Sequence, residues 1–312
     1  MEIYQLRYFA TVAEMGSFTK AALKCNISQP SLSQQIINLE TELNQKLFHR
    51  LGRKISLTPA GQMLLERSRR ILMEVDNALK ELGDDKTAKH RVTVGAIPTL
   101  APYLMPKIIA RCRMNYPNLL VSTYEDFIPY LVESVAEGEI DLALASLPVI
   151  DRRVIVEPLF KEPLLLVLSY EHRLADQKII TANDLIEESF IMLGTSSSVA
   201  AQIRSFCGDN HFEPHVVHGC SQIKTLKMLV GLNLGIAIMP AGTMSPEDEL
   251  TLLYRELSGP GAPTREVALI RHPRRFVSRG TEQFMATVRD TLARAPIPML
   301  PATAPLLNSP QG

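Results

Sequence analysis

The chain has 312 residues, of which 46% are hydrophobic and 21% are charged, and its formal net charge at pH 7 is zero. This length exceeds the size at which one hydrophobic core usually stops growing, so we expect two or more domains. The sequence has no run of about eighteen apolar residues and no charged-then-apolar leader. We therefore expect a cytoplasmic protein rather than a membrane-spanning or exported one.

Charge and cysteine content narrow the class of protein only a little. Residues 1–90 hold 13 Lys and Arg against 10 Asp and Glu, and the rest of the chain holds 20 against 23. This excess is too small to identify a nucleic-acid-binding protein. Cys25, Cys112, Cys207 and Cys220 lie far apart without paired spacing, which argues against a disulfide framework or a zinc site. We expect no metal and no cofactor.

The first part of the chain indicates short helices joined by tight turns. Apolar residues recur at helical spacing from Leu6, Gly16 interrupts them, and a second helix is predicted over Phe18–Lys24. Ser28 is then a good N-cap for a third helix, and Asn44 can adopt the left-handed conformation that ends it. This arrangement predicts a helix-turn-helix.

The third helix has an uncharged polar face where a surface helix usually carries Lys and Glu. Its apolar stripe comprises Leu32, Ile36, Leu39 and Leu43, so its opposite face is free to contact a partner. Hydrogen-bonding side chains on such a face can read base edges in the major groove. A polar solvent face is the simpler alternative. The predicted DNA-contacting residues of this helix are Gln29, Pro30, Ser31, Ser33, Gln34 and Asn38.

A small hairpin is predicted over residues 47–57, with its turn at Leu51 and Gly52. Its basic residues Arg50, Arg53 and Lys54 would contact phosphates. Such contacts add affinity for DNA without reading its sequence.

Thr58 and Pro59 then open a long helix, as its cap and its first residue. Apolar residues repeat along it as an a/d seam of about three heptads, which is more apolar than a free helix needs. We expect residues 59–90 to form a dimerisation helix and a hinge, with a linker over 83–90. The predicted dimerisation residues are Leu65, Leu72, Val75, Leu79 and Leu82.

From Arg91 onward, strands alternate with helices, which is typical of α/β units with mostly parallel sheets. This region, residues 91–294, is long enough for two lobes. A strand over 264–273 and the amphipathic helix after it are expected to complete the first lobe. The tail over 295–312 is rich in Pro and small residues, and we expect it to be disordered. The other predicted strands are 91–97, 119–125, 140–146, 162–169, 189–194, 214–219 and 235–240.

Three strings, LRYFATVAEMGSFTKAA, SQPSLSQQIINLETELNQKLF and RLGRKISLTPAG, closely resemble the N-terminal domain of LysR-type transcriptional regulators. The remainder resembles the effector-binding domain of that family. The resemblance implies an all-α N-terminal part with a winged helix-turn-helix, a long linker helix, and a two-lobe α/β domain like that of periplasmic binding proteins. It implies double-stranded DNA, a small-molecule effector, RNA polymerase and further copies of the chain, as a homodimer or homotetramer, as partners. Gln34 stands where many members have Arg, and Asn44 where most have Gly.

The family's layout places the effector in the cleft between the lobes, where strand ends meet helix N-termini that bind anions. Its walls should include Thr99, Thr195, Ser196 and Ser198. Helix capping is an equally weighted alternative role for these four residues.

Within the family, Cys25 and the string FIMLGTSSSVAAQIRSFC resemble the peroxide-sensing subfamily. In that frame the peroxide-reactive cysteine falls on Ser198, and its disulfide partner falls on Cys207. A serine hydroxyl stays protonated near neutral pH and cannot be oxidised to a sulfenic acid. We therefore expect a small polar or anionic ligand in place of the dithiol switch.

These observations predict a sequence-specific DNA-binding transcriptional regulator that responds to a small-molecule or redox signal. We assign no catalytic residue, because the sequence contains no GxGxxG, GxxxxGK[ST] or GxSxG motif. The main alternative is a periplasmic-type solute-binding protein, against which the first 90 residues and the missing leader argue. A small α/β enzyme is a third alternative, which the absence of a catalytic motif disfavours.

Overall fold

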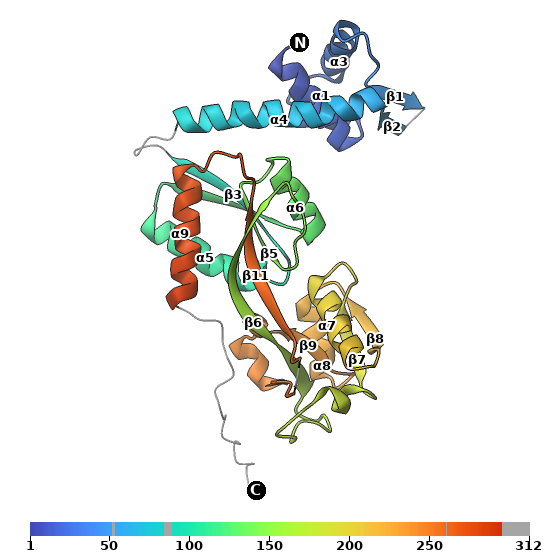
Figure 1. Ribbon diagram of the computed structural model, residues 1–312, viewed down its shortest axis with the longest axis vertical. Coiled ribbons are helices and arrows are strands. Elements are labelled where there is room, and N and C mark those ends of the chain that lie inside the picture. The colour runs from blue at the N-terminus through green and yellow to red at the C-terminus, as the bar shows by residue number, and fades with distance from the viewer. Residues whose placement is uncertain (52–53, 84–88, 260, 295–312) are drawn as a thin grey trace. The chain divides into compact units, whose positions relative to one another are not determined.

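The computed structural model describes residues 1–51, 54–83, 89–259 and 261–294 (Figure 1). The chain divides into two compact units: unit 1 comprises Met1–Ala88 with Arg274–Ser278, and unit 2 comprises Lys89–Pro273 with Arg279–Gly312. The tail over 295–312 lies outside the described residues, as does most of the predicted linker after Gly83.

Unit 1 begins with helices whose ends follow local sequence signals. Gly16 ends the first helix in the left-handed conformation, and Asn44 adopts a φ of 49° beyond the end of the third. The Ser28 side chain accepts a hydrogen bond from the N–H of Ser31 and so caps the third helix, as predicted. The helices are α1 (Ile3–Met15), α2 (Phe18–Lys24) and α3 (Gln29–Glu42).

The predicted hairpin and long helix follow directly. Strands β1 (Phe48–Leu51) and β2 (Lys54–Leu57) pair antiparallel, and α4 (Pro59–Leu82) begins after them. Gly61, in the first turn of α4, lies so close to the hairpin that a Cβ atom there would stand 2.1 Å from the Leu47 carbonyl oxygen. Only glycine fits at this position without moving the backbone.

One hydrophobic core holds unit 1 together. It includes Phe9 of α1, Leu32 and Ile36 of α3, Phe48 of the hairpin and Leu65 of α4. Because the apolar stripe of α3 is fully used in this core, its polar face points away from it, as the sequence pattern predicted.

Unit 2 contains two lobes. Lobe I has a core around strands β3 (His90–Ala96), β4 (Leu119–Glu125) and β5 (Leu142–Ser146), covered by helices α5 (Ala101–Asn115), α6 (Ile128–Ala136) and α9 (Arg279–Arg294). Strand β3 pairs in parallel with both β4 and β5. In Figure 1, α5 and α9 lie on one side of this sheet and α6 lies on the other. The C-terminal helix completes this lobe, as predicted, because Phe284 and Val288 belong to its core.

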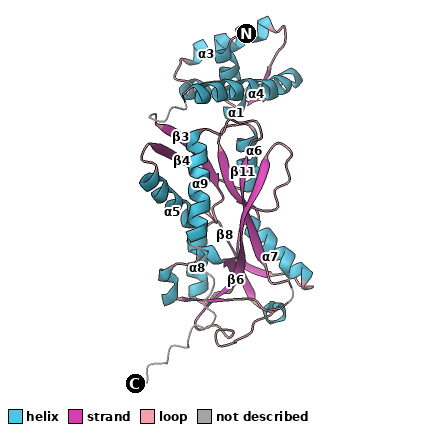
Figure 2. Cartoon of the chain, turned by 60° about the vertical axis from the view of Figure 1, so that its left-hand side comes forward, coloured by secondary structure: helices cyan, strands magenta, loops and turns pink. Residues whose placement is uncertain are grey.

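Two long strands connect the lobes, and they correct the prediction of mostly parallel sheets. Strand β6 (Ile155–Ser169) carries the chain from lobe I to lobe II, and β11 (Thr264–Arg271) carries it back, so the two must run in opposite directions (Figure 2). Beyond β11, β6 also pairs antiparallel with β9 (Ala237–Pro240) and with β10 (Leu252–Arg255). The strand order of this mixed sheet is β10-β6-β11-β5-β3-β4.

Lobe II has two separate hydrophobic cores. Strands β7 (Ser189–Leu193) and β8 (His215–Cys220) form a parallel pair, with helices α7 (Ser198–Asp209) and α8 (Ile223–Gly231). One core gathers Ile203 and Cys207 of α7, and a separate core gathers Leu226 of α8 and Cys220. Short 3-10 turns complete the lobe: Ala182–Leu185, Ala241–Thr243 and Pro246–Leu250.

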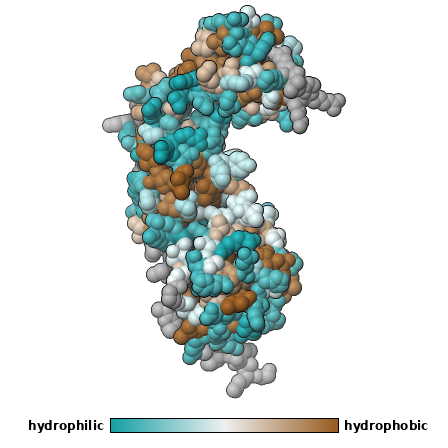
Figure 3. Space-filling model, turned by 45° about the vertical axis from the view of Figure 1, so that its right-hand side comes forward, coloured by the Kyte–Doolittle hydropathy of each residue, from teal (hydrophilic) through white to brown (hydrophobic). Residues whose placement is uncertain are grey.

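On the face shown in Figure 3, hydrophobic residues are interspersed with hydrophilic ones throughout both units. No helix in the described part of the chain is both long enough and apolar enough to span a membrane.

Candidate functional site

The polar face of α3 is the first candidate site. Five of the predicted residues, Gln29, Pro30, Ser31, Gln34 and Asn38, are exposed, whereas Ser33 is half-buried. Ser33 therefore lies at the flank of the face and not at its centre.

Hydrogen bonds order part of this face. Gln34 Nε2 donates to Asn38 Oδ1 at 2.9 Å, one helical turn away, and the Ser28 and Ser31 hydroxyls lie 2.7 Å apart. Among the described residues, the Gln34 oxygen and the Asn38 NH2 group have no further partner, so this pair presents an acceptor and a donor side by side. That combination matches an adenine edge.

The basic hairpin lies partly outside the described residues. Arg50 and Lys54 lie in β1 and β2, and Arg53 lies outside the described part of the chain.

Glu40 connects α3 to this hairpin. Its buried side chain accepts hydrogen bonds from the backbone N–H groups of Leu47 at 2.9 Å and Phe48 at 3.4 Å. Burial raises the pKa of Glu40, but these bonds and the nearby Lys46 outweigh it and hold that pKa below its usual range. Sequence inspection missed this role, because a Glu near a helix end usually faces solvent.

The apolar seam of α4 divides into two parts. Leu65 is 6% exposed because the first turns of α4 pack on the unit 1 core, so Leu65 is a core residue and not part of an open stripe. This corrects the prediction that groups it with the others. Leu72 and Val75 are half-buried, and Leu79 and Leu82 are 64% and 87% exposed. An open apolar stripe thus remains toward the C-terminal end of α4.

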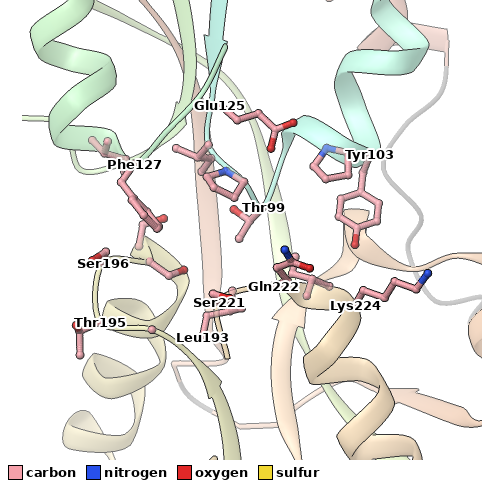
Figure 4. Close-up of a pocket in the computed structure, with 18 residues that line it drawn as sticks. Thr99, Tyr103, Glu125, Phe127, Leu193, Thr195, Ser196, Ser221, Gln222 and Lys224 are labelled. Atoms are coloured by element: carbon pink, nitrogen blue, oxygen red, sulfur yellow. The ribbon is translucent and has the colours of Figure 1, made fainter. Parts of the chain in front are cut away.

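The second candidate site is a cavity of about 630 Å³ in unit 2 to which both lobes contribute (Figure 4). All four predicted effector residues line it: Thr99 from lobe I, and Thr195, Ser196 and Ser198 from lobe II. Glu125 and the aromatic residues Tyr103 and Phe127 add to the lobe I wall, and Ser221, Gln222 and Lys224 add to the lobe II wall.

The predicted residues differ in how free they are to meet a ligand. Thr195 and Ser196 are exposed. The Ser198 hydroxyl, however, lies 2.7 Å from the Ser146 hydroxyl at the end of β5, which links α7 to lobe I. Thr99 is buried, and its hydroxyl accepts a hydrogen bond from Arg265 Nη1 at 2.8 Å.

Two helices of lobe II begin at this cavity with open backbone donors. The N-caps of α7 and α8, Ser197 and Gln222, make no capping side-chain bond. The N–H groups of the first helical turns, residues 198–200 and 223–225, make no hydrogen bond to any residue that the structure describes. Ser197 is 8% exposed, and its hydroxyl also has no partner among the described residues. Helix N-termini in this state carry partial positive charge and attract anions.

A buried ion pair lies behind the cavity wall. Arg265 of β11 and Glu162 of β6 are 1% and 2% exposed, and Arg265 Nε donates to Glu162 Oε1 at 2.6 Å. The other Glu162 oxygen accepts from the Gly242 N–H at 2.8 Å. Because Arg265 also donates to the Thr99 hydroxyl and carbonyl, this pair joins the crossing strands to the cavity wall. Sequence inspection missed it, since nothing local relates residues 103 positions apart.

A polar cluster of lobe II lies next to Tyr103 of the cavity wall. The Asp248 carboxylate accepts from Lys227 Nζ at 2.6 Å and from the Tyr254 hydroxyl at 2.7 Å. Burial raises the pKa of Asp248, but these hydrogen bonds outweigh it and the net pKa is lowered. Lys227 Nζ also lies 5.7 Å from the ring centre of Tyr103, so a lobe I residue rests against this lobe II cluster.

The cysteines are not arranged as a redox pair. Cys112, Cys207 and Cys220 are buried, and Cys25 is half-buried. Cys207 and Cys220 belong to different cores of lobe II. Burial raises the pKa of Cys207 to about 11, which suppresses the thiolate that would react with an oxidant.

Comparison with known proteins connects both candidate sites to one architecture. The family of bacterial regulatory helix-turn-helix proteins, lysR family, matches residues 3–62, and the LysR substrate binding domain matches residues 85–293. The hydrogen peroxide-inducible genes activator of Pectobacterium carotovorum subsp. carotovorum is 31% identical over 293 residues, covering 93% of this chain and 96% of that protein. The DNA-binding transcriptional dual regulator OxyR of Escherichia coli is 31% identical over 292 residues, covering 93% and 95%. A solved full-length OxyR variant from Pseudomonas aeruginosa has a TM-score of 0.75 and 26% identity, and covers 93% of this chain and 95% of that one.

A periplasmic-type solute-binding protein does not account for the helix-turn-helix match over residues 3–62, so that alternative is set aside. The two matched families together cover most of the chain, in the order that the sequence predicted. The chain is a DNA-binding transcription regulator that belongs to the LysR family.

Proposed function

We propose that this regulator reads a specific duplex with α3 and responds to a small polar or anionic ligand in the cavity between its lobes. The observation that carries the proposal is the cavity: both lobes line it, and the open N–H groups of α7 and α8 border it. A ligand that touches both lobes binds one lobe arrangement better than another, and it therefore shifts the population between them.

The DNA-contacting role rests on the exposed face of α3. Gln29, Gln34 and Asn38 are assigned to base edges, and Ser31 and Ser33 to bases or phosphates, with Pro30 holding the first turn. The basic residues Arg50, Arg53 and Lys54 are assigned to phosphates. In this proposal residues 1–58 form the DNA-binding domain.

Oligomerisation is assigned to residues 59–90, through the open stripe formed by Leu72, Val75, Leu79 and Leu82. A homodimer presents two copies of α3 to two half-sites, and a homotetramer of two such dimers would span a longer operator. Residues 91–294 bind the effector, and RNA polymerase is the expected further partner. We assign no enzymatic activity, and place the protein in the cytoplasm because its DNA target lies there.

The signal is assigned to ligand binding and not to a dithiol switch. Two relatives are named for hydrogen peroxide induction or as OxyR. In this chain, however, Ser198 stands where the subfamily has its reactive cysteine, and its hydroxyl bonds to Ser146. No second cysteine lies in the core that holds Cys207, among the described residues.

Fluorescence anisotropy with the DNA upstream of the protein's own gene tests this function. The full chain should bind that duplex about 10³-fold or more tighter than a scrambled duplex of equal length and composition. Its affinity should fall steeply between 50 and 200 mM salt, roughly 10³-fold or more for 6–10 phosphate contacts. Equal affinity for both duplexes, after footprinting has covered the neighbouring upstream regions, would rule out the assigned readout.

A further inference from the structure

The two lobes contribute opposite electrostatic character to the cavity. Lobe II contributes the open N–H groups at the starts of α7 and α8, and Lys224 lies at the cavity edge. Lobe I contributes the carboxylate of Glu125, at the end of β4. In Figure 4, Glu125 lies on the lobe I side, across the cavity from Ser221 and Gln222 of lobe II.

Glu125 differs from the acidic residue beside it. Asp126 is engaged, because its carboxylate accepts from the Tyr124 hydroxyl and from the Phe127 N–H, each at 2.8 Å. The Glu125 side chain is exposed and lines the cavity, and its carboxylate has no hydrogen bond or ion pair with any residue in the described part of the chain. A carboxylate in this position is open to solvent and to a ligand that enters the cavity.

A ligand with only negative charge does not suit both walls. Its anionic group would be favoured at the α7 and α8 N-termini, but closure of the lobes around it would desolvate Glu125 beside an apolar or anionic group. A ligand that also carries an ammonium group satisfies Glu125 and gains a charge-assisted hydrogen bond there. The rest of the lobe I wall is largely apolar, with Pro98, Pro102, Phe127 and Ile128, and favours a hydrocarbon body beside the ammonium group.

We infer that the effector is a small zwitterion of the amino-acid class, whose carboxylate binds at the N-termini of α7 and α8 and whose ammonium group faces Glu125. The inference rests on the proposed function, because it takes this cavity as the effector site. It adds the chemical class of the ligand, and it makes Glu125 the residue that distinguishes a zwitterion from a plain organic acid.

The experiment uses the full chain and matched probes. Isothermal titration with the standard L-amino acids should identify at least one that binds. For that amino acid, two probes keep the carbon skeleton: the acid that lacks the amino group and the amine that lacks the carboxylate. Each should bind about tenfold or more weakly than the amino acid, because each leaves one wall without a charged partner.

Variants then locate the ammonium group. Glu125→Gln should weaken the amino acid about tenfold and bring its affinity close to that of the deaminated acid, whose own affinity should hold or rise. Glu187→Gln is the matched control, because Glu187 is an exposed carboxylate of lobe II that does not line the cavity. It should change neither affinity, and ligand-free melting temperatures of both variants verify folding.

Three results would overturn the inference: no amino acid binds, the deaminated acid binds as tightly as the amino acid, or Glu125→Gln weakens both equally. Operator binding measured on the same preparations distinguishes failure of the ligand class from failure of the proposed function. Specific duplex binding that responds to a plain organic acid would retain the proposed function and remove the zwitterion, whereas loss of specific duplex binding would remove the proposed function itself.

Discussion

The buried pair Glu162–Arg265 provides the sharpest test of how unit 2 is held together. Glu162→Gln keeps the shape of the side chain but removes the charge that faces Arg265. It also removes one of two acceptor oxygens, because the single amide oxygen can accept from the Gly242 N–H or from Arg265 Nε but not from both positions. Arg265 is 1% exposed and stays protonated, so the variant leaves a cation in the interior with a neutral partner.

The expected loss of stability follows from that burial. Removing one member of a buried pair costs about 3–5 kcal/mol, and Glu162→Gln should fall in this range because it removes the charge and leaves one of the two buried donors without an acceptor. The double variant Glu162→Gln with Arg265→Met removes the orphan charge. It also gives up the two bonds to Thr99, at about 1 kcal/mol each. Because removal of the uncompensated charge offsets that loss, the double variant should be no less stable than Glu162→Gln alone.

Urea unfolding of the full chain, with hydrogen exchange of the β6 and β11 peptides to locate the change, measures these differences. The control is Glu157→Gln, on the same strand as Glu162. It breaks the exposed pair between Glu157 and Arg289 of α9 and should cost about 1 kcal/mol or less. The single variant Arg265→Met is measured as well. If the double variant were destabilised by the sum of the Glu162→Gln and Arg265→Met effects, the uncompensated-charge reasoning would be refuted. A Glu162→Gln effect no larger than that of Glu157→Gln would also refute it.

Four further outcomes are expected. Gln29→Ala or Ser33→Ala should relax sequence preference by roughly 1–3 kcal/mol for each good base-specific hydrogen-bonding pair that the substitution removes, measured against operators with single base changes, and an unchanged preference would move the docking face elsewhere. Leu72→Lys should dissociate the oligomer and sharply reduce operator affinity while unit 1 stays folded, and sedimentation that shows an intact oligomer would contradict the α4 assignment. The lowered pKa of Asp248 adds stability that is present above its unfolded pKa of about 3.9 and is lost as pH falls through the pKa of the folded protein. Asp248→Asn should therefore make the free energy of unfolding depend less on pH below about pH 4. Acid titration at a fixed urea concentration measures this. Micromolar peroxide should leave the thiol count and the footprint unchanged, because burial raises the pKa of Cys207, and rapid loss of two thiols with a shifted footprint would restore a redox switch.

Local sequence signals are sufficient to predict the elements of unit 1 and most of those in unit 2. Ser28 and Thr58 cap helices through hydrogen bonds that reach only three residues along the chain, and Asn44 ends a helix by its own backbone preference. Strand β4 falls on its predicted residues, 119–125. Capping and periodicity are local properties, so the sequence alone displays them. The family followed from an equally local signal, the string that begins at Ser28.

How distant segments meet could not be predicted from the sequence and is seen in the three-dimensional structure. The crossing of β6 and β11 made the central sheet mixed, because the chain must pass to lobe II and return. It also brought Arg265 to Thr99, 166 residues away, and placed Glu125 opposite the α7 and α8 N-termini. Leu65 has the same heptad position as Leu72, but its side chain is buried in the hydrophobic core of unit 1 and is not part of the open stripe. Partners of this kind depend on chain closure in three dimensions, and no spacing within the sequence specifies them.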